Sequence, residues 1–82
     1  MSANRATTPG FRDPRYRTLI QSLIAERKRL GLTQQALADR LGLHKQWVSR
    51  VELGERRLDV VEFADFARAL DLSPAALVES IG

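Results

Sequence analysis

Apolar residues recur along this chain at spacings of three and four, in five segments separated by short links that are polar or contain glycine. The first segment follows Asp13 and Pro14, a pair typical of a helix N-cap and first helical position, and it ends at Gly31. Its apolar face carries Leu19, Ile20, Leu23, Ile24 and Leu30, with Arg27 on the same side. No stretch alternates apolar and polar residues in steps of two, so the pattern predicts an all-α domain.

Residues 34–53 have the spacing of a helix-turn-helix. One helix is expected over 34–41, ended by Gly42, and another over 45–53, ended by Gly54. The side chains expected to face inward are Leu37, Ala38, Leu41, Val48 and Val51. A small side chain where the two helix axes approach, together with a glycine at the turn, is what such a unit requires.

Two further helices are predicted after this unit. Asp59 and Glu62 form a capping-box pattern, and Ser73 with Pro74 repeats the signal of an N-cap followed by proline. The fourth helix has a broad apolar face made of Val60, Val61, Phe63, Ala64, Phe66, Ala67 and Leu70, and the short fifth helix contains Leu77, Val78 and Ile81. The sequence thus predicts five helices in one compact domain over 13–82, preceded by a flexible polar tail over 1–12.

Charge is distributed unevenly around the net value of +3. Residues 1–57 hold twelve Lys or Arg against five Asp or Glu, whereas residues 58–82 hold one against five. This asymmetry favours a face that binds a polyanion opposite a face with another role, although an incidental surface asymmetry explains it as well. The N-terminal arginines, Arg5, Arg12, Arg15 and Arg17, belong either to an arm that contacts DNA or to a solvated tail.

Several classes of protein are disfavoured by the composition. The chain has no cysteine and one histidine, so neither a disulfide framework nor a metal site or cofactor is expected. It lacks a glycine-rich phosphate loop and clustered carboxylates, which argues against an enzyme. The apolar runs are too short to span a membrane, and no small-molecule ligand is evident, so a soluble cytoplasmic protein is expected.

The third predicted helix carries the residues suited to DNA. Gln46 and Arg50 lie four residues apart, and glutamine pairs with adenine and arginine with guanine through two hydrogen bonds each. Lys45 is suited to a guanine or to a phosphate. Trp47 is expected either to contact DNA as part of the base-reading set or to pack beside the second helix. Double-stranded DNA is therefore the predicted partner.

The whole pattern resembles a known family. The stretches 31–38 (GLTQQALA), 41–43 (LGL), 47–55 (WVSRVELGE) and 56–63 (RRLDVVEF) look like those of the phage-repressor and Cro-type (XRE) helix-turn-helix regulators of bacteria. The resemblance covers about residues 17–78. It implies a five-helix, lambda-repressor-like domain that binds an operator as a homodimer, either as repressor or as activator.

Further residue roles follow from the motif and the resemblance. In the family, Arg27 and Glu52 form a partly buried ion pair, and the equivalent of Gln34 commonly contacts a DNA phosphate. The expected phosphate-binding set is Thr33, Gln34, His44, Ser49, Arg56 and Arg57. Glu55 departs from the family, in which a residue able to bind phosphate is common there. Leu53 is similarly apolar where polar residues are common.

The C-terminal helices suggest an interface. Their large apolar residues exceed what a core of this size obviously needs, so some are candidates for dimerisation, with a purely internal role as the alternative. The candidates are Phe63, Phe66, Leu77, Val78 and Ile81. An antitoxin-like or adaptor module that binds another protein as well as DNA is the alternative function.

Overall fold

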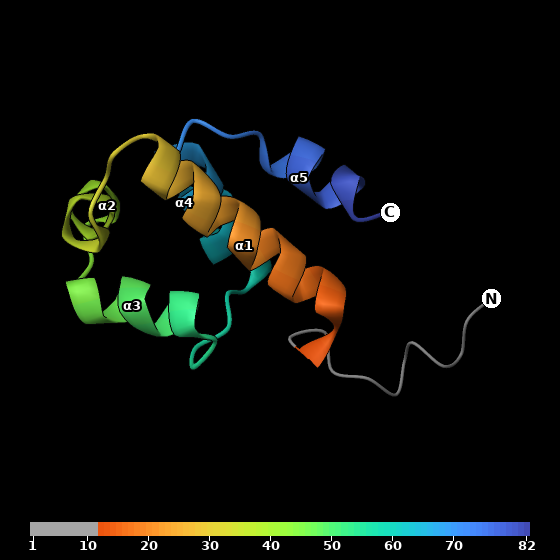
Figure 1. The fold of residues 1–82 in the computed structure, drawn as a ribbon, viewed down its shortest axis with the longest axis horizontal. Helices are drawn as coiled ribbons and strands as arrows, with labels where there is room; N and C mark the ends of the chain where they lie inside the picture. Colours follow the sequence, from red (N-terminus) through yellow and green to blue (C-terminus); the bar gives the residue numbers. More distant parts are fainter. Residues whose placement is uncertain (1–11) are drawn as a thin grey trace.

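The computed structural model describes residues 12–82, and within that range the chain forms five α-helices and no strand (Figure 1). The helices are α1 (Pro14–Arg29), α2 (Gln34–Leu41), α3 (Lys45–Leu53), α4 (Val60–Ala69) and α5 (Pro74–Ser80). The all-α prediction is confirmed. The predicted tail lies, except for Arg12, outside the described residues.

Side-chain caps fix where most helices begin. The Asp13 carboxylate accepts from the Arg15 backbone N–H before α1, and the Ser73 hydroxyl accepts from the Ala76 N–H before α5. Asp59 and Glu62 form a complete capping box at α4, since each side chain accepts from the backbone N–H of the other. These contacts satisfy N–H groups that a first helical turn leaves without an intrahelical partner.

One apolar cluster joins all the elements up to Leu70. The helix α2 packs against both α3 and α4, α1 packs against α3, and α4 packs against α5 (Figure 1). The buried side chains are Ile20, Leu23, Leu37, Ala38, Val48, Val51, Leu58, Phe63, Phe66, Ala67 and Leu70. Because α2 and α3 each contribute two of these residues, the helix-turn-helix is held by the same core as the rest of the domain.

The apolar face of α4 is narrower than the sequence pattern predicts. Val60 and Val61 are 84% and 69% exposed, so neither belongs to the core. A helix turns about 100° per residue, which puts Val61 roughly 200° from the buried Phe63 and on the opposite side of α4. Val60 occupies the first helical position, three residues before Phe63 and on the same side of α4, where it lines an apolar groove at the surface.

Candidate nucleic-acid interface

The turn between α2 and α3 has the geometry that its residues favour. Gly42 ends α2 with a φ of 69°, and the next N–H, of Leu43, donates to the Ala38 carbonyl at 2.9 Å. No atom lies within 4 Å of the position of a Cβ on Gly42, so the positive φ alone makes glycine suitable. Ala38 and Val48 are fully buried where the two helices meet. The unit therefore presents α3 at a fixed angle to α2.

The outer side of α3 is polar and exposed to solvent. Lys45, Gln46 and Arg50 are exposed, and Ser49 is half-buried. Within the part of the chain that the structure describes, the side chains of Lys45, Gln46 and Arg50 make no hydrogen bond or ion pair. Residues four apart project from the same side of a helix, so Gln46 and Arg50 are available to one surface at the same time.

The polar residues at the starts of α2 and α3 differ in how far their side chains are engaged within the fold. The Thr33 hydroxyl accepts from the Ala36 N–H at 3.0 Å, which leaves its own O–H to donate elsewhere. The Gln34 side-chain amide donates to Glu52 Oε1 at 2.9 Å, so it is held inside the fold. His44 is exposed and forms no side-chain cap on α3.

Arg27 and Glu52 connect α1 to α3. The Arg27 guanidinium donates to both Glu52 oxygens and, through Nη1, to the Leu32 carbonyl at 2.7 Å. The side chains retain only 10% and 11% of their exposure. Together with Gln34 they form a closed polar network that fixes the C-terminal half of α3 and the start of α2.

Two arginines assigned by sequence to a possible N-terminal arm belong to α1. Arg15 pairs with the Asp13 carboxylate at 2.9 Å. The guanidinium of Arg17 lies against the end of α3, where its Nη2 is 3.4 Å from the Glu52 carbonyl oxygen. A cation at a helix C-terminus interacts favourably with the helix dipole. Sequence reasoning missed this contact, because no local signal joins residues 35 positions apart.

Trp47 does not project with the exposed row. Its half-buried ring lies 5.3 Å from the ring of Phe66, centroid to centroid, at an interplanar angle of 44°. The Arg56 guanidinium carbon lies 4.8 Å from the centroid of the same indole. The structure thus places Trp47 against α4 and against the loop that joins α3 to α4. The packing alternative considered from the sequence had it beside α2.

The two arginines of the loop after α3 have different surroundings. Arg56 pairs with the Glu62 carboxylate at 3.0 Å, and Glu62 is also the capping residue of α4. Arg57 is exposed in the same loop. No local signal pointed to the pairing of Glu62 with Arg56, because capping alone accounts for a glutamate at that position.

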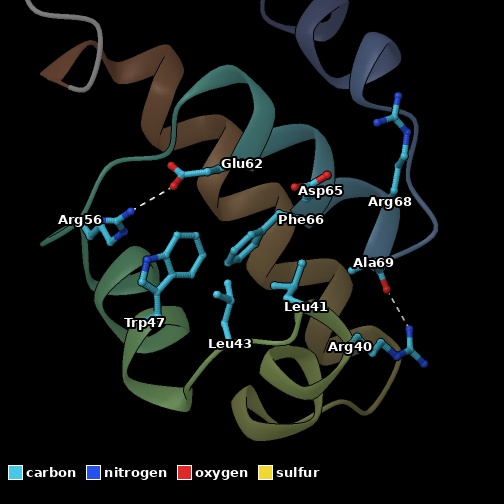
Figure 2. A pocket seen from close by; sticks show the side chains of 10 residues that line it. All are labelled: Arg40, Leu41, Leu43, Trp47, Arg56, Glu62, Asp65, Phe66, Arg68 and Ala69. Carbon is cyan, nitrogen blue, oxygen red and sulfur yellow. Dashed lines mark hydrogen bonds and ion pairs between the residues drawn. The ribbon is translucent and has the colours of Figure 1, made fainter.

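Trp47, Arg56 and Glu62 border a groove of about 690 Å³ between the helix-turn-helix and α4 (Figure 2). Leu41, Leu43, Trp47 and Phe66 form its apolar part. At one end Arg56 reaches Glu62, and at the other Arg40 donates to the Ala69 carbonyl at 2.8 Å. The groove is therefore spanned at both ends by arginine contacts.

The candidate interface residues of the C-terminal helices fall into two groups. Phe66 is 2% exposed and Phe63 is 9% exposed, so both are part of the core, which is the internal role that the sequence offered as the alternative to an interface. They lie on the inward side of α4, which packs against α2 and α5. Val78 is 51% exposed, whereas Leu77 and Ile81 are half-buried.

Comparison with known proteins supports the same motif. The model of a family described as "Helix-turn-helix domain" matches residues 22–80. A solved structure of an XRE-family like protein from Pseudomonas syringae pv. tomato is 44% identical, with a TM-score of 0.79 and 83% of each chain covered. No curated protein matches the chain significantly.

The chain belongs to the XRE family of helix-turn-helix proteins. An XRE-type domain is a DNA-binding regulator, and its fold is typical of regulators without enzymatic activity. In this XRE-family chain, none of the described helices is long and apolar enough to cross a membrane. Residues 12–82 also contain no group of three or more His, Cys, Asp or Glu side chains arranged to hold a metal ion.

Proposed function

We propose that this XRE-family chain is a sequence-specific transcriptional regulator that inserts α3, its recognition helix, into the major groove of a palindromic operator. The observation that carries the proposal is the exposed row of Lys45, Gln46 and Arg50, which have no partner among the described residues. In the major groove, glutamine and arginine discriminate bases through paired hydrogen bonds. Trp47 is left out of this base-reading set, because its ring packs on Phe66.

Phosphate contacts would position the helix on the duplex. The first turns of α2 and α3 offer backbone N–H groups and the side chains of Thr33 and His44, and Ser49 and Arg57 lie on or just after α3. Gln34 would contribute its backbone N–H, since its side-chain amide is bound to Glu52. Such contacts do not depend on base sequence.

A dimer is part of the proposal, because one short helix covers few base pairs. Two-fold dimers place two recognition helices one DNA turn apart, roughly 34 Å, on an inverted repeat. An apolar groove of about 600 Å³ lies between α1, α4 and α5, with the exposed Val60 and Val78 among its lining residues. We assign the homodimer contact to this groove.

Binding of an operator in the cytoplasm of a bacterial cell would make the protein a repressor where the site overlaps a promoter. The same apolar groove also fits the second candidate function, an antitoxin-like or adaptor role in which another protein occupies it. Purification of the native protein together with a stoichiometric second chain would favour that candidate.

Titration of short labelled duplexes with the purified protein tests the proposal. We expect saturation at two chains per duplex and affinity that falls steeply with salt, because Lys and Arg release counterions from phosphates. Binding that is absent at low salt would contradict it.

A further inference from the structure

Arg56 is attached to three parts of the molecule. Its backbone N–H donates to the Arg50 carbonyl at 3.2 Å, which ties it to the end of α3. Its guanidinium lies over the Trp47 indole in the first turn of α3, and its Nη2 donates to Glu62 in the first turn of α4 (Figure 2). We call these three side chains the Trp47–Arg56–Glu62 cluster.

The cluster restrains the rotation of α3 about its own axis. Trp47 directly follows Gln46 and lies three residues before Arg50, so a rotation of α3 about its axis turns all three side chains together. One part of the ring packs on Phe66, which is 2% exposed, and the guanidinium packs on the indole as well. A turn of α3 that redirected Gln46 and Arg50 would have to break both contacts.

We infer that Trp47 and Arg56 are positioning residues, which set the sequence preference of α3 by orienting Gln46 and Arg50 without contacting DNA themselves. This inference rests on the proposed function. It changes the role expected for Arg56, because a guanidinium that is paired with a carboxylate and covers an indole is poorly placed to neutralise a phosphate.

The strength of the cluster limits the size of the effect. A cation over an exposed or half-buried indole and a partly exposed ion pair are each modest interactions. When these interactions are lost, part of the free energy of specific binding must be used to orient α3. The affinity for the preferred sequence should therefore fall roughly 5- to 30-fold. Non-specific binding depends on phosphate contacts and should change little.

Three variants of the full chain test the inference on a preferred and an unrelated duplex. Arg56→Ala removes the cluster from the loop side. Glu62→Gln removes the ion pair while keeping an amide oxygen that can accept the Asp59 N–H, as capping boxes allow. Arg68→Ala removes one positive charge from the lining of the same groove without touching the cluster, and it serves as the matched control.

The expected result is a lower ratio of specific to non-specific affinity in Arg56→Ala and Glu62→Gln, with the salt slope and Arg68→Ala unchanged. The double variant should lose no more than Arg56→Ala alone, because both changes break the same contact. A phosphate-binding Arg56 gives the opposite pattern: Arg56→Ala lowers the slope by about 0.9 and leaves the ratio unchanged, and that result would overturn the inference.

Fluorescence provides a readout that does not depend on DNA. Trp47 is the only tryptophan, so its emission and its quenching by acrylamide report the cluster directly. Quenching should increase in Arg56→Ala and stay at the wild-type level in Arg68→Ala, at matched thermal stability. A wild type without sequence preference would contradict the proposed function and the inference together. A selective wild type whose ratio is unaffected by Arg56→Ala would contradict the inference alone.

Discussion

Arg27 on α1 and Glu52 on α3 form a bidentate ion pair, with Nε and Nη2 donating to the two carboxylate oxygens at 2.6 and 3.0 Å. Both side chains are largely withdrawn from water. Since α3 carries the exposed row, this pair couples the longest helix of the domain to the placement of its DNA-binding surface. The ion pair therefore stabilises the fold and is not itself part of the DNA-binding surface.

Arg27→Ala should therefore destabilise the domain before it affects binding. The variant leaves the Glu52 carboxylate nearly buried with only the Gln34 amide as a side-chain partner, which is expected to cost about 3 to 5 kcal/mol of unfolding free energy. Thermal and urea unfolding measure this loss. Arg29→Ala, which breaks an exposed pair with Glu26 on the same helix, is the matched control and should unfold almost as the wild type does. Normal stability of Arg27→Ala would refute the structural role.

Gln46→Ala and Arg50→Ala should relax base preference. Each removes a side chain that can form two hydrogen bonds to one base, so each should cost about 1 to 3 kcal/mol of binding free energy at particular base pairs only. Binding to a set of single-base operator variants measures this dependence. Gln21→Ala, an exposed substitution on α1, is the control. Uniform weakening across all sequences would show that the two residues contact phosphates instead.

Arg57→Ala should weaken binding to every sequence alike. A single phosphate contact contributes about 0.9 to the slope of log affinity against log salt, so the slope should fall by that amount. The measurement is a salt titration on preferred and unrelated duplexes, with Arg68→Ala as a control of equal charge. An altered base preference with an unchanged slope would assign Arg57 to base recognition.

Val78→Asp should dissociate the proposed dimer without unfolding the domain. Val78 is exposed and lines the groove between α1, α4 and α5, where a carboxylate would be buried in the interface. We expect dimer affinity to fall at least about tenfold, since an uncompensated buried charge costs several kcal/mol. Val61→Asp is the control, because Val61 is exposed on the other side of α4. Sedimentation with and without DNA measures the change, and a monomeric wild type on DNA would reject the interface.

The sequence was sufficient to predict the helix boundaries, because these depend on local signals. Caps such as Asp13, Asp59 and Ser73, and the helix-ending glycines Gly42 and Gly54, each specify a boundary within a few residues of themselves. For this reason all five helices were predicted close to where they occur.

Features that depend on distant residues could not be predicted in the same way. The pairing of Arg56 with Glu62, the place of Trp47 and the contact of Arg17 with α3 are set by how helices pack, and one sequence carries no signal for them. Apolar character likewise did not separate the buried Phe66 from the exposed Val61, because burial depends on the rotation of α4.

Selection of bound duplexes from a random pool tests the central claim most directly, that paired α3 helices recognise a palindromic DNA sequence. The enriched sequences should contain an inverted repeat with half-sites centred about one helical turn apart, roughly 34 Å. The same selection with Gln46→Ala or Arg50→Ala should lose information at symmetry-related positions of both halves. A pool without an enriched sequence, or with a single asymmetric site that these variants leave unchanged, would contradict the claim.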